Sequence, residues 1–287
     1  MLTFDVEEYF HVEAVAARLS RERWDTMERR LPAEVDEILQ LLAEFDVRAT
    51  FFVLGWVARN EEAVVKRIAA AGHEIASHGM SHAMLTRLSP VALAAELADS
   101  KALLEDMCGQ AVAGFRAPTF SVMHGTAWAL DALTRCGYAY DSSVFPVRHD
   151  RYGVPEAPTM PHWAVGPEGG RLLELPPLTL RMLGANLPVG GGGYMRLLPT
   201  GLMAKGLRRC ESQGCGGMIY LHPWEFDPGQ PVLPMSRVGR WRHRVNLHKT
   251  HAKLRRLMQR FAFTDVRSQL PTLRERASQT FPYGAKQ

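Results

Sequence analysis

Hydrophobic and polar positions alternate along the chain in blocks that predict a strand followed by a helix, several times over. Residues 2–5 are typical of a buried strand, and residues 32–45 then repeat apolar side chains at helical spacing, with Pro32 in the first turn. The segment ATFFVLG at 49–55 is β-branched and aromatic enough for a second strand. Further strands are predicted at 73–77, 113–116, 138–141 and 218–222, with helices up to about 71 and at 90–107, 126–135 and 200–211.

Strands that alternate with helices at this rhythm form parallel βαβ units, so we predict an α/β fold whose strands close into a barrel. Residues 148–199 break the rhythm because they are rich in Pro and Gly, including GGGG at 190–193. We expect long loops and irregular strands there, over one rim of the barrel. The predicted organisation is a barrel over residues 1–235 and a basic helical extension over 236–287 that packs on it.

Composition narrows the class of protein without defining its chemistry. The chain has 287 residues, a hydrophobic content of 46% and a net charge of +4, all ordinary for a soluble globular protein. No apolar run approaches the roughly 20 residues that span a bilayer, and the amino terminus MLTFDVEEYF is acidic, so we expect a cytoplasmic protein. The four cysteines form no CxxC pair, and we expect free, buried thiols.

Positive charge is concentrated near the carboxyl terminus. Residues 237–260 contain nine Arg or Lys residues and no acid, and apolar residues recur there at helical spacing, namely Leu247, Leu254, Met258 and Phe261. This pattern fits a helix that packs on the barrel. It also fits a surface for an anionic partner such as a membrane, a lipid-linked glycan or nucleic acid. The net charge is too small to favour nucleic acid, so we expect no nucleic-acid partner.

Ionisable residues follow the predicted strands at the edge where a parallel barrel carries its function. They are Asp5, Glu7, His78, His82, Arg116, Asp141 and His222. Two imidazoles and one carboxylate leave open positions on a divalent ion, which is the arrangement of a catalytic metal site. His78 and His82 can reach one ion if the backbone between them turns helically. The spacing of the acids leaves open whether Glu7 or Glu8 binds the metal.

Other candidates have two interpretations each. Aromatic residues on predicted rim loops could support a sugar or pack in the core, and they are Tyr9, Phe10, Tyr152, Trp163 and Tyr194. His73 precedes its strand, so we expect it at the opposite rim in a structural role. His11 and His149 fit either the cleft or ordinary loop positions.

Several stretches resemble the polysaccharide deacetylases of carbohydrate esterase family 4, the NodB homology domain. TFDVEEYF resembles the first motif, with Asp-x-acid in place of Asp-Asp, and GHEIASHGMSH resembles the His-x-x-x-His metal motif. GFRAPTFS resembles the Arg-x-Pro motif and IYLHPWEFDP the final Leu-x-His motif, so the order matches from residue 2 to about 228. YDSSVFP, HDRYG, GGGGYMR and HPWEFDP resemble the exosortase-associated branch found with exopolysaccharide genes.

The resemblance implies a distorted (β/α) barrel that removes acetyl groups from N-acetylated sugars with one divalent metal. Zinc is the expected ion, with cobalt, nickel and manganese as alternatives. By motif position, Glu7, His78 and His82 would bind the metal, Asp5 would be the general base and His222 the general acid. Arg116 would orient Asp5 and keep it ionised, and the backbone amide of Thr119 would help hold the oxyanion. Tyr194 is the expected substrate contact in the glycine-rich loop.

The usual fourth motif, which ends in Asp-Trp, is absent from this chain. We therefore expect Asp141 to tune His222, with Asp150 and Glu174 as alternatives.

The predicted function is N-deacetylation of a saccharide or lipid-linked glycan in exopolysaccharide synthesis. Two other functions compete with it: an allantoinase-like amide or ureide hydrolase on the same barrel, and a catalytically silent glycan-binding protein. Contact with an anionic membrane is a further expectation from the basic segment.

Overall fold

The computed structural model describes residues 1–284, and the last three residues of the predicted extension, 285–287, lie outside the described part. Nine strands form the main sheet in the order β10-β1-β2-β3-β4-β5-β7-β6-β11. Their bounds are β1 (Leu2–Val6), β2 (Thr50–Val53), β3 (Glu74–Ser77), β4 (Gly114–Phe115), β5 (Tyr140–Asp141), β6 (His162–Val165), β7 (Arg171–Glu174), β10 (Ile219–Leu221) and β11 (Thr280–Pro282). A small antiparallel pair consists of β8 (Thr179–Met182) and β9 (Ala185–Pro188).

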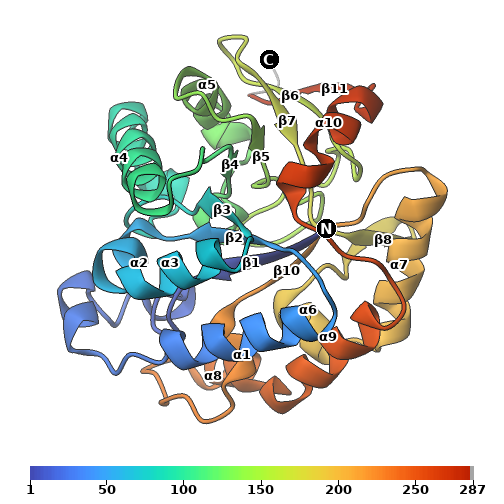
Figure 1. Cartoon of the computed structure of the whole chain (residues 1–287). Coiled ribbons are helices and arrows are strands. Elements are labelled where there is room, and N and C mark those ends of the chain that lie inside the picture. The colour runs from blue at the N-terminus through green and yellow to red at the C-terminus, as the bar shows by residue number, and fades with distance from the viewer. Residues whose placement is uncertain (285–287) are drawn as a thin grey trace.

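Helices form an outer ring around the central strands (Figure 1). Those of the first half are α1 (Leu31–Glu44), α2 (Gly55–Asn60), α3 (Glu62–Ala70), α4 (Pro90–Cys108) and α5 (Trp128–Arg135). Those of the second half are α6 (Gly192–Leu197), α7 (Thr200–Ser212), α8 (Arg237–Arg244), α9 (Thr250–Met258) and α10 (Val266–Arg276). None of the described helices has both the length and the apolar character that a bilayer crossing requires.

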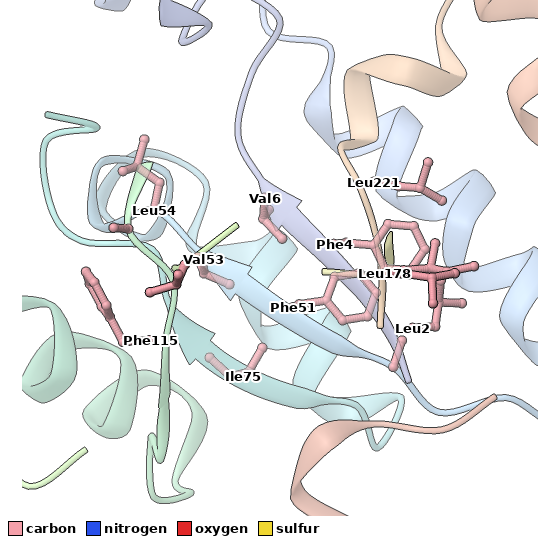
Figure 2. Close-up of a cluster of buried hydrophobic side chains, with 14 of the residues drawn as sticks. Leu2, Phe4, Val6, Phe51, Val53, Leu54, Ile75, Phe115, Leu178 and Leu221 are labelled. Atoms are coloured by element: carbon pink, nitrogen blue, oxygen red, sulfur yellow. The ribbon is translucent and has the colours of Figure 1, made fainter. Parts of the chain in front are cut away.

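Strand β1 is central because it pairs in parallel with both β2 and β10. Its alternate residues Phe4 and Val6 pack toward the helices, and the Phe4 ring stacks on Phe51 of β2 at 5.0 Å between centroids. Figure 2 shows this layer of apolar side chains from neighbouring strands. The other face of β1 carries Thr3 and Asp5, which contact a buried arginine inside the barrel. Alternation along one strand thus separates the hydrophobic core from the polar interior.

The ring of parallel strands closes through the chain that follows β7. Leu175 donates its backbone N–H to Asp141 of β5, and two residues later Pro177 forms a parallel bridge with Met218 beside β10. Gly191 forms a second bridge with Tyr220. A Cβ at Gly191 would lie 1.7 Å from the Tyr220 carbonyl oxygen, so this glycine is required for the close approach. The predicted distorted α/β barrel is confirmed.

Residues 148–199 are more regular than predicted. They contain four short strands and α6, and β7 enters the main sheet next to β5. Because β6 pairs antiparallel with β7 and β11 pairs with β6, this edge of the sheet contains segments from both halves of the chain. Each strand has only four residues or fewer, which is too short for a clear period-two pattern to appear in the sequence.

The basic segment is not the single helix that its spacing suggests. Asn246 has a left-handed backbone (φ 52°) and separates α8 from the 3-10 turn Leu247–Lys249 and α9. The apolar residues Leu247, Leu254 and Met258 are buried as predicted, and α9 packs against α6 and α7. The boundary at residue 236 stays a prediction, and β11 joins the same sheet as the barrel strands.

Other local predictions also change. The helix expected up to residue 71 is split into α2 and α3 at Glu61, whose backbone is non-helical (φ −134°, ψ 47°). The strand expected at 138–141 starts only at Tyr140. All four cysteines are free, but only Cys210 is fully buried.

A buried acid in α1 provides a test of the fold that is independent of function. Glu34 is 4% exposed, and neither of its carboxylate oxygens has a hydrogen-bond partner among the described residues. Burial, with the nearby Glu8 adding to it, raises the pKa of Glu34 from 4.5 to about 9. The folded state therefore holds this proton more tightly than the unfolded state, and stability falls as the pH rises through this range.

We predict that Glu34→Gln raises the melting temperature at pH 8 and changes it little at pH 5. Each unit of pKa difference corresponds to about 1.4 kcal/mol, so a gain of about 1–3 kcal/mol is expected at the higher pH. Thermal unfolding followed by circular dichroism at both values measures this. Glu37→Gln, at an exposed position of the same helix, is the control. Equal shifts for the two variants would contradict the prediction.

Candidate active site

The predicted site residues are brought together at the carboxyl ends of β1, β3, β4 and β10. They line or underlie a cleft of about 370 Å³. Asp5, Glu7, His78, His82, Thr119, Tyr194 and His222 all line it. Asp5, Glu7 and His78 are almost fully buried, so only their functional atoms face the cleft.

Glu7, His78 and His82 form a group whose potential ligand atoms lie within 4.8 Å of one another. The His82 Nε2 and Glu7 Oε2 atoms are 2.5 Å apart, yet this Glu7 oxygen has no partner with hydrogen-bond geometry among residues 1–284. A buried carboxylate oxygen without a donor is costly unless something else neutralises it. Two imidazole nitrogens and one carboxylate oxygen are the donor set of a catalytic zinc-type site, so these residues fit a divalent metal.

Glu7, and not Glu8, faces the two histidines. Strand β1 ends at Val6, and the chain then turns so that Glu8 points to the start of α1. There the Glu8 carboxylate accepts hydrogen bonds from the backbone N–H groups of Arg30 and Leu31, at 3.0 and 3.2 Å. Helix N-termini bind carboxylates in this way because their first N–H groups lack partners. The choice left open by the sequence is therefore resolved by geometry in favour of Glu7.

The loop between His78 and His82 is irregular and not helical. Gly79 and His82 both have left-handed backbones, with φ 75° and φ 52°. Glu96 of α4 accepts hydrogen bonds from the backbone of Met80 and Ser81, which fixes the loop from outside. On the other side Gly55 donates to Gly79, and a Cβ at Gly55 would lie 2.1 Å from the Met80 sulfur. Contacts of this loop with α4 and with Gly55, and not a helical turn, therefore bring the His78 and His82 rings together.

His78 has a fixed tautomer. Its Nδ1 lies 2.8 Å from the carbonyl oxygen of Arg116, which can only accept, so Nδ1 carries the proton. The Nε2 atom is then free to bind a metal, in the manner of histidine ligands held by an outer partner. Burial lowers the pKa of His78 to about 4, so its ring is neutral at physiological pH.

Arg116 is completely buried and also contacts Asp5. Its Nη1 donates to Asp5 Oδ1 at 2.5 Å and to the Thr3 hydroxyl at 2.9 Å. Its Nε and Nη2 donate to the backbone carbonyl and hydroxyl of Ser142. Asp5 Oδ2, on the side away from Arg116, lies 3.9 Å from His222 Nε2. Asp5 is thus held by an arginine on one oxygen and faces the cleft with the other.

His222 extends from the end of β10 between the two acids. Its Nε2 is 3.8 Å from Glu7 Oε1, and the Trp224 ring stacks on its imidazole at 5.0 Å. Trp224 also donates its indole N–H to Glu7 Oε1 at 3.1 Å, so one aromatic residue links the two groups.

The prediction that Asp141 tunes His222 is wrong. The His222 Nδ1 atom is 2.8 Å from Glu225 Oε1, and the His222 backbone N–H donates to the same oxygen at 3.1 Å. The other Glu225 oxygen accepts from Arg196 Nε at 2.7 Å, and Arg196 is itself buried. Burial disfavours the charged form of His222 and lowers its pKa. The hydrogen bond to Glu225 and the nearby acids outweigh burial and raise the pKa of His222 to about 9.

Asp141 and the two alternatives have other partners. Asp141 accepts a hydrogen bond from the Ser143 hydroxyl at 2.5 Å and lies beside Glu174, while Asp150 pairs with His149 at 3.0 Å. Burial raises the pKa of Asp141 to about 6, and burial together with Asp141 raises the pKa of Glu174 further. Burial therefore favours the protonated form of both carboxyls, and within residues 1–284 no hydrogen bond or ion pair joins either of them to His222.

Glu225 and Arg196 were missed by sequence reasoning. A signal for Glu225 existed, because a Glu three residues after His222 at the start of a short helical turn is the spacing of a capping box. The 3-10 turn Pro223–Phe226 has that arrangement. Nothing in the sequence pointed to Arg196, which comes from α6, 29 residues away from its partner.

The structure also sorts the remaining candidates. Tyr152 and Tyr194 line the cleft, whereas Tyr9 and Phe10 are buried in a cluster with Trp24. Trp163 lies on β6 at the sheet edge, where Arg171 stacks on it at 4.1 Å.

The remaining histidine candidates, His11, His73 and His149, divide in the same way. His149 lines the cleft. His11 is enclosed by aromatic rings behind His82, and His73 accepts a hydrogen bond from Ala49 below the strands, as predicted. Thr119 has a left-handed backbone (φ 59°) at the cleft wall.

Comparison with known proteins adds the family context. Residues 21–140 match the family model described as polysaccharide deacetylase, and residues 142–271 match one described as a domain of unknown function, DUF3473. These comparisons support a polysaccharide deacetylase domain in this chain. The first match includes His78, His82 and Arg116 of this domain, whereas Asp5 and Glu7 precede it and His222 lies in the second match.

Curated relatives match about a third of the chain. A chitooligosaccharide deacetylase from Rhizobium leguminosarum bv. trifolii is 35% identical over 102 residues, which is 34% of this chain and 43% of that protein. A chitin deacetylase from Pestalotiopsis sp is 35% identical over 109 residues, covering 37% and 36% respectively. The matches thus span less than half the length of these relatives.

A solved structure has a similar fold over the whole chain. A proposed polysaccharide deacetylase from Mycobacterium smegmatis aligns with a TM-score of 0.63 at 19% identity, covering 100% of this chain and 94% of that one. At this identity the likeness concerns the fold alone. The predicted resemblance to carbohydrate esterase family 4 is supported, and the narrower exosortase-associated branch stays a prediction.

Proposed function

We propose that this chain is a metal-dependent hydrolase that removes acetyl groups from an N-acetylated saccharide or glycan. The observation that carries the proposal is the convergence of the Glu7, His78 and His82 donor group with Asp5 and His222 on one cleft. The activities for which the relatives are named, deacetylation of chitooligosaccharide and of chitin, are consistent with it. A role in exopolysaccharide synthesis is part of this proposal and rests on the motif resemblance.

Glu7 and the two histidines would hold the metal, and zinc is the ion that this donor set suits best. A divalent ion there lowers the pKa of a water molecule and polarises the acetamide carbonyl. The side chains and backbone of this chain supply the base, the acid and the oxyanion contact. Asp5 accepts the proton of the attacking water, because Arg116 holds its other oxygen and keeps the free oxygen aimed at the cleft.

His222 protonates the departing amine. Its raised pKa keeps the imidazolium populated at neutral pH, and Glu225 on Nδ1 directs Nε2 to the cleft. Thr119 and Tyr194 both line the cleft. The backbone amide of Thr119 would help hold the oxyanion, and Tyr194 would contact the sugar. Together these groups would activate the attacking water, stabilise the oxyanion and protonate the departing amine. No covalent intermediate with the protein is needed.

The experiment that tests the proposal measures acetate release and metal content on the same samples. Metal-loaded wild type should release acetate from a chitin oligosaccharide, and His78→Ala/His82→Ala should lose the metal and at least about 100-fold of the rate. The pair His248→Ala/His251→Ala, which lies outside the cleft, is the control and should keep both the metal and the rate. Acetate release at the wild-type rate by the His78/His82 variant would contradict the mechanism.

The same assay separates the competing functions. Ring opening of allantoin without acetate release would favour the allantoinase-like hydrolase. Glycan binding by metal-replete protein without turnover of any amide would favour a silent binding protein.

A second prediction concerns Glu225 as a positioning residue. Glu225→Gln should lower kcat by about 10–100-fold with unchanged metal content, because His222 loses the group that orients it and favours its protonation. The pKa of His222 should fall, so the decline of activity at high pH should begin at a lower pH than in wild type. Glu225→Asp should restore part of the rate. An unchanged pH profile in Glu225→Gln would mean that Glu225 has only a structural role.

We also propose that the protein makes peripheral contact with an anionic membrane. Arg255 of the basic segment already pairs with Glu44 and stacks on Phe45, so it is a weaker candidate than α8, which exposes Val238 and Trp241. Charge reversal at Arg237 and Arg240 of α8 should reduce sedimentation with phosphatidylserine vesicles, and reversal at Arg256 is the comparison. Equal binding by all three proteins would overturn the proposal.

A further inference from the structure

Most charged groups around the cleft have a partner of opposite sign. Asp5 pairs with Arg116, and Arg196 pairs with Glu225. Glu13, on the wall formed by the segment after β1, pairs with Arg87. Glu7 faces His82 and belongs to the metal group. The negative charges of the acidic side chains in the cleft are therefore already balanced by positive or metal-binding groups of the protein, without a substrate.

Two arginines on the opposite wall are different. Arg151, in the loop after β5, and Arg242, on α8, both line the cleft and are exposed. Within residues 1–284, neither guanidinium takes part in an ion pair or a side-chain hydrogen bond. The acid next to Arg151 in sequence, Asp150, is engaged by His149 and does not line the cleft.

The position of Arg242 is fixed by the groups that orient the proposed acid. Arg196, which binds Glu225, also donates to the backbone carbonyls of His243 and Val245 at 2.8 and 2.9 Å. His243 is further held by Gln230 at 2.7 Å. The carboxyl-terminal end of α8, which carries Arg242, is thereby tied to the site. Tyr152, stacked on His149 at 3.9 Å, occupies the same wall beside Arg151.

We propose that Arg151 and Arg242 form an anion subsite, and that the substrate is an N-acetylated saccharide with a carboxylate or phosphate next to the acetamido sugar. This inference rests on the proposed deacetylase function and specifies its substrate class. Guanidinium groups suit both anions because their planar donors match two oxygens at once. A neutral chitin-like oligomer would leave both arginines solvated and would gain nothing from them. Aromatic side chains on the same wall provide the apolar contact that a sugar ring needs.

The test compares three substrates of different charge with metal-loaded protein. They are a neutral chitin tetramer, an oligosaccharide of alternating glucuronate and N-acetylglucosamine, and N-acetylglucosamine 1-diphosphate linked to uridine. Wild type should show a kcat/KM at least about tenfold higher for one of the two anionic substrates, as a charge-assisted contact provides. The carboxylate and phosphate arms identify which anion is preferred.

Arg151→Gln/Arg242→Gln should reduce this preference to about one, and higher salt should weaken it in wild type. Arg59→Gln/Arg208→Gln removes the same charge from exposed positions outside the cleft and should keep the preference. Equal kcat/KM for neutral and anionic substrates in wild type would overturn the anion subsite while leaving the deacetylase function intact.

Binding distinguishes failure of the subsite from failure of the proposed function. If no substrate releases acetate, titration calorimetry with the same three saccharides still measures the preference. Tighter binding of an anionic saccharide that disappears in the Arg151/Arg242 variant would support the subsite without turnover. Equal or absent binding of all three would overturn it.

Discussion

The buried guanidinium of Arg116 is the group on which the site depends. It is completely enclosed, and its side chain binds Asp5 while its backbone carbonyl binds His78. One residue therefore sets the geometry of both the proposed base and a proposed metal ligand. A buried ion pair of this kind adds little net stability, but removing one partner leaves an uncompensated charge that costs about 3–5 kcal/mol. The Asp5 carboxylate is the acidic partner of this guanidinium, and the same contact leaves the other Asp5 oxygen facing the cleft.

A second buried arginine positions a proposed catalytic residue on the other side of the cleft. Arg196 is buried with Glu225, and Glu225 binds His222, so each side of the proposed reaction centre has its own arginine. The two pairs lie on different elements, β4 with β1 and α6 with the turn after β10. Asp5 is held as an acceptor and His222 as a donor.

The sequence was a good guide wherever a residue is placed by the strand that carries it. Asp5 and His222 follow alternating or apolar strands, and the edge of a parallel barrel brings such residues together. Sequence reasoning failed where placement depends on a contact between distant loops. Asp141 was chosen because it ends a strand, but it faces Glu174 beneath the cleft, and Glu225 takes its expected role from a turn next to His222. Likewise Tyr9 was expected on a rim loop and is buried, because a second small core forms around Trp24.

The two matched regions contribute different parts of one site. Residues 21–140 contain His78, His82 and Arg116, whereas residues 142–271 contain His222, Glu225, Arg196 and the wall formed by α8. The usual fourth motif is absent from the first region, and the tuning acid comes instead from the second. Because Arg196 also anchors the α8 backbone, a change in the second region that moves α8 would alter the orientation of His222 and the shape of the cleft together. The orientation of His222 and the position of the α8 wall are therefore coupled through a single buried arginine, Arg196.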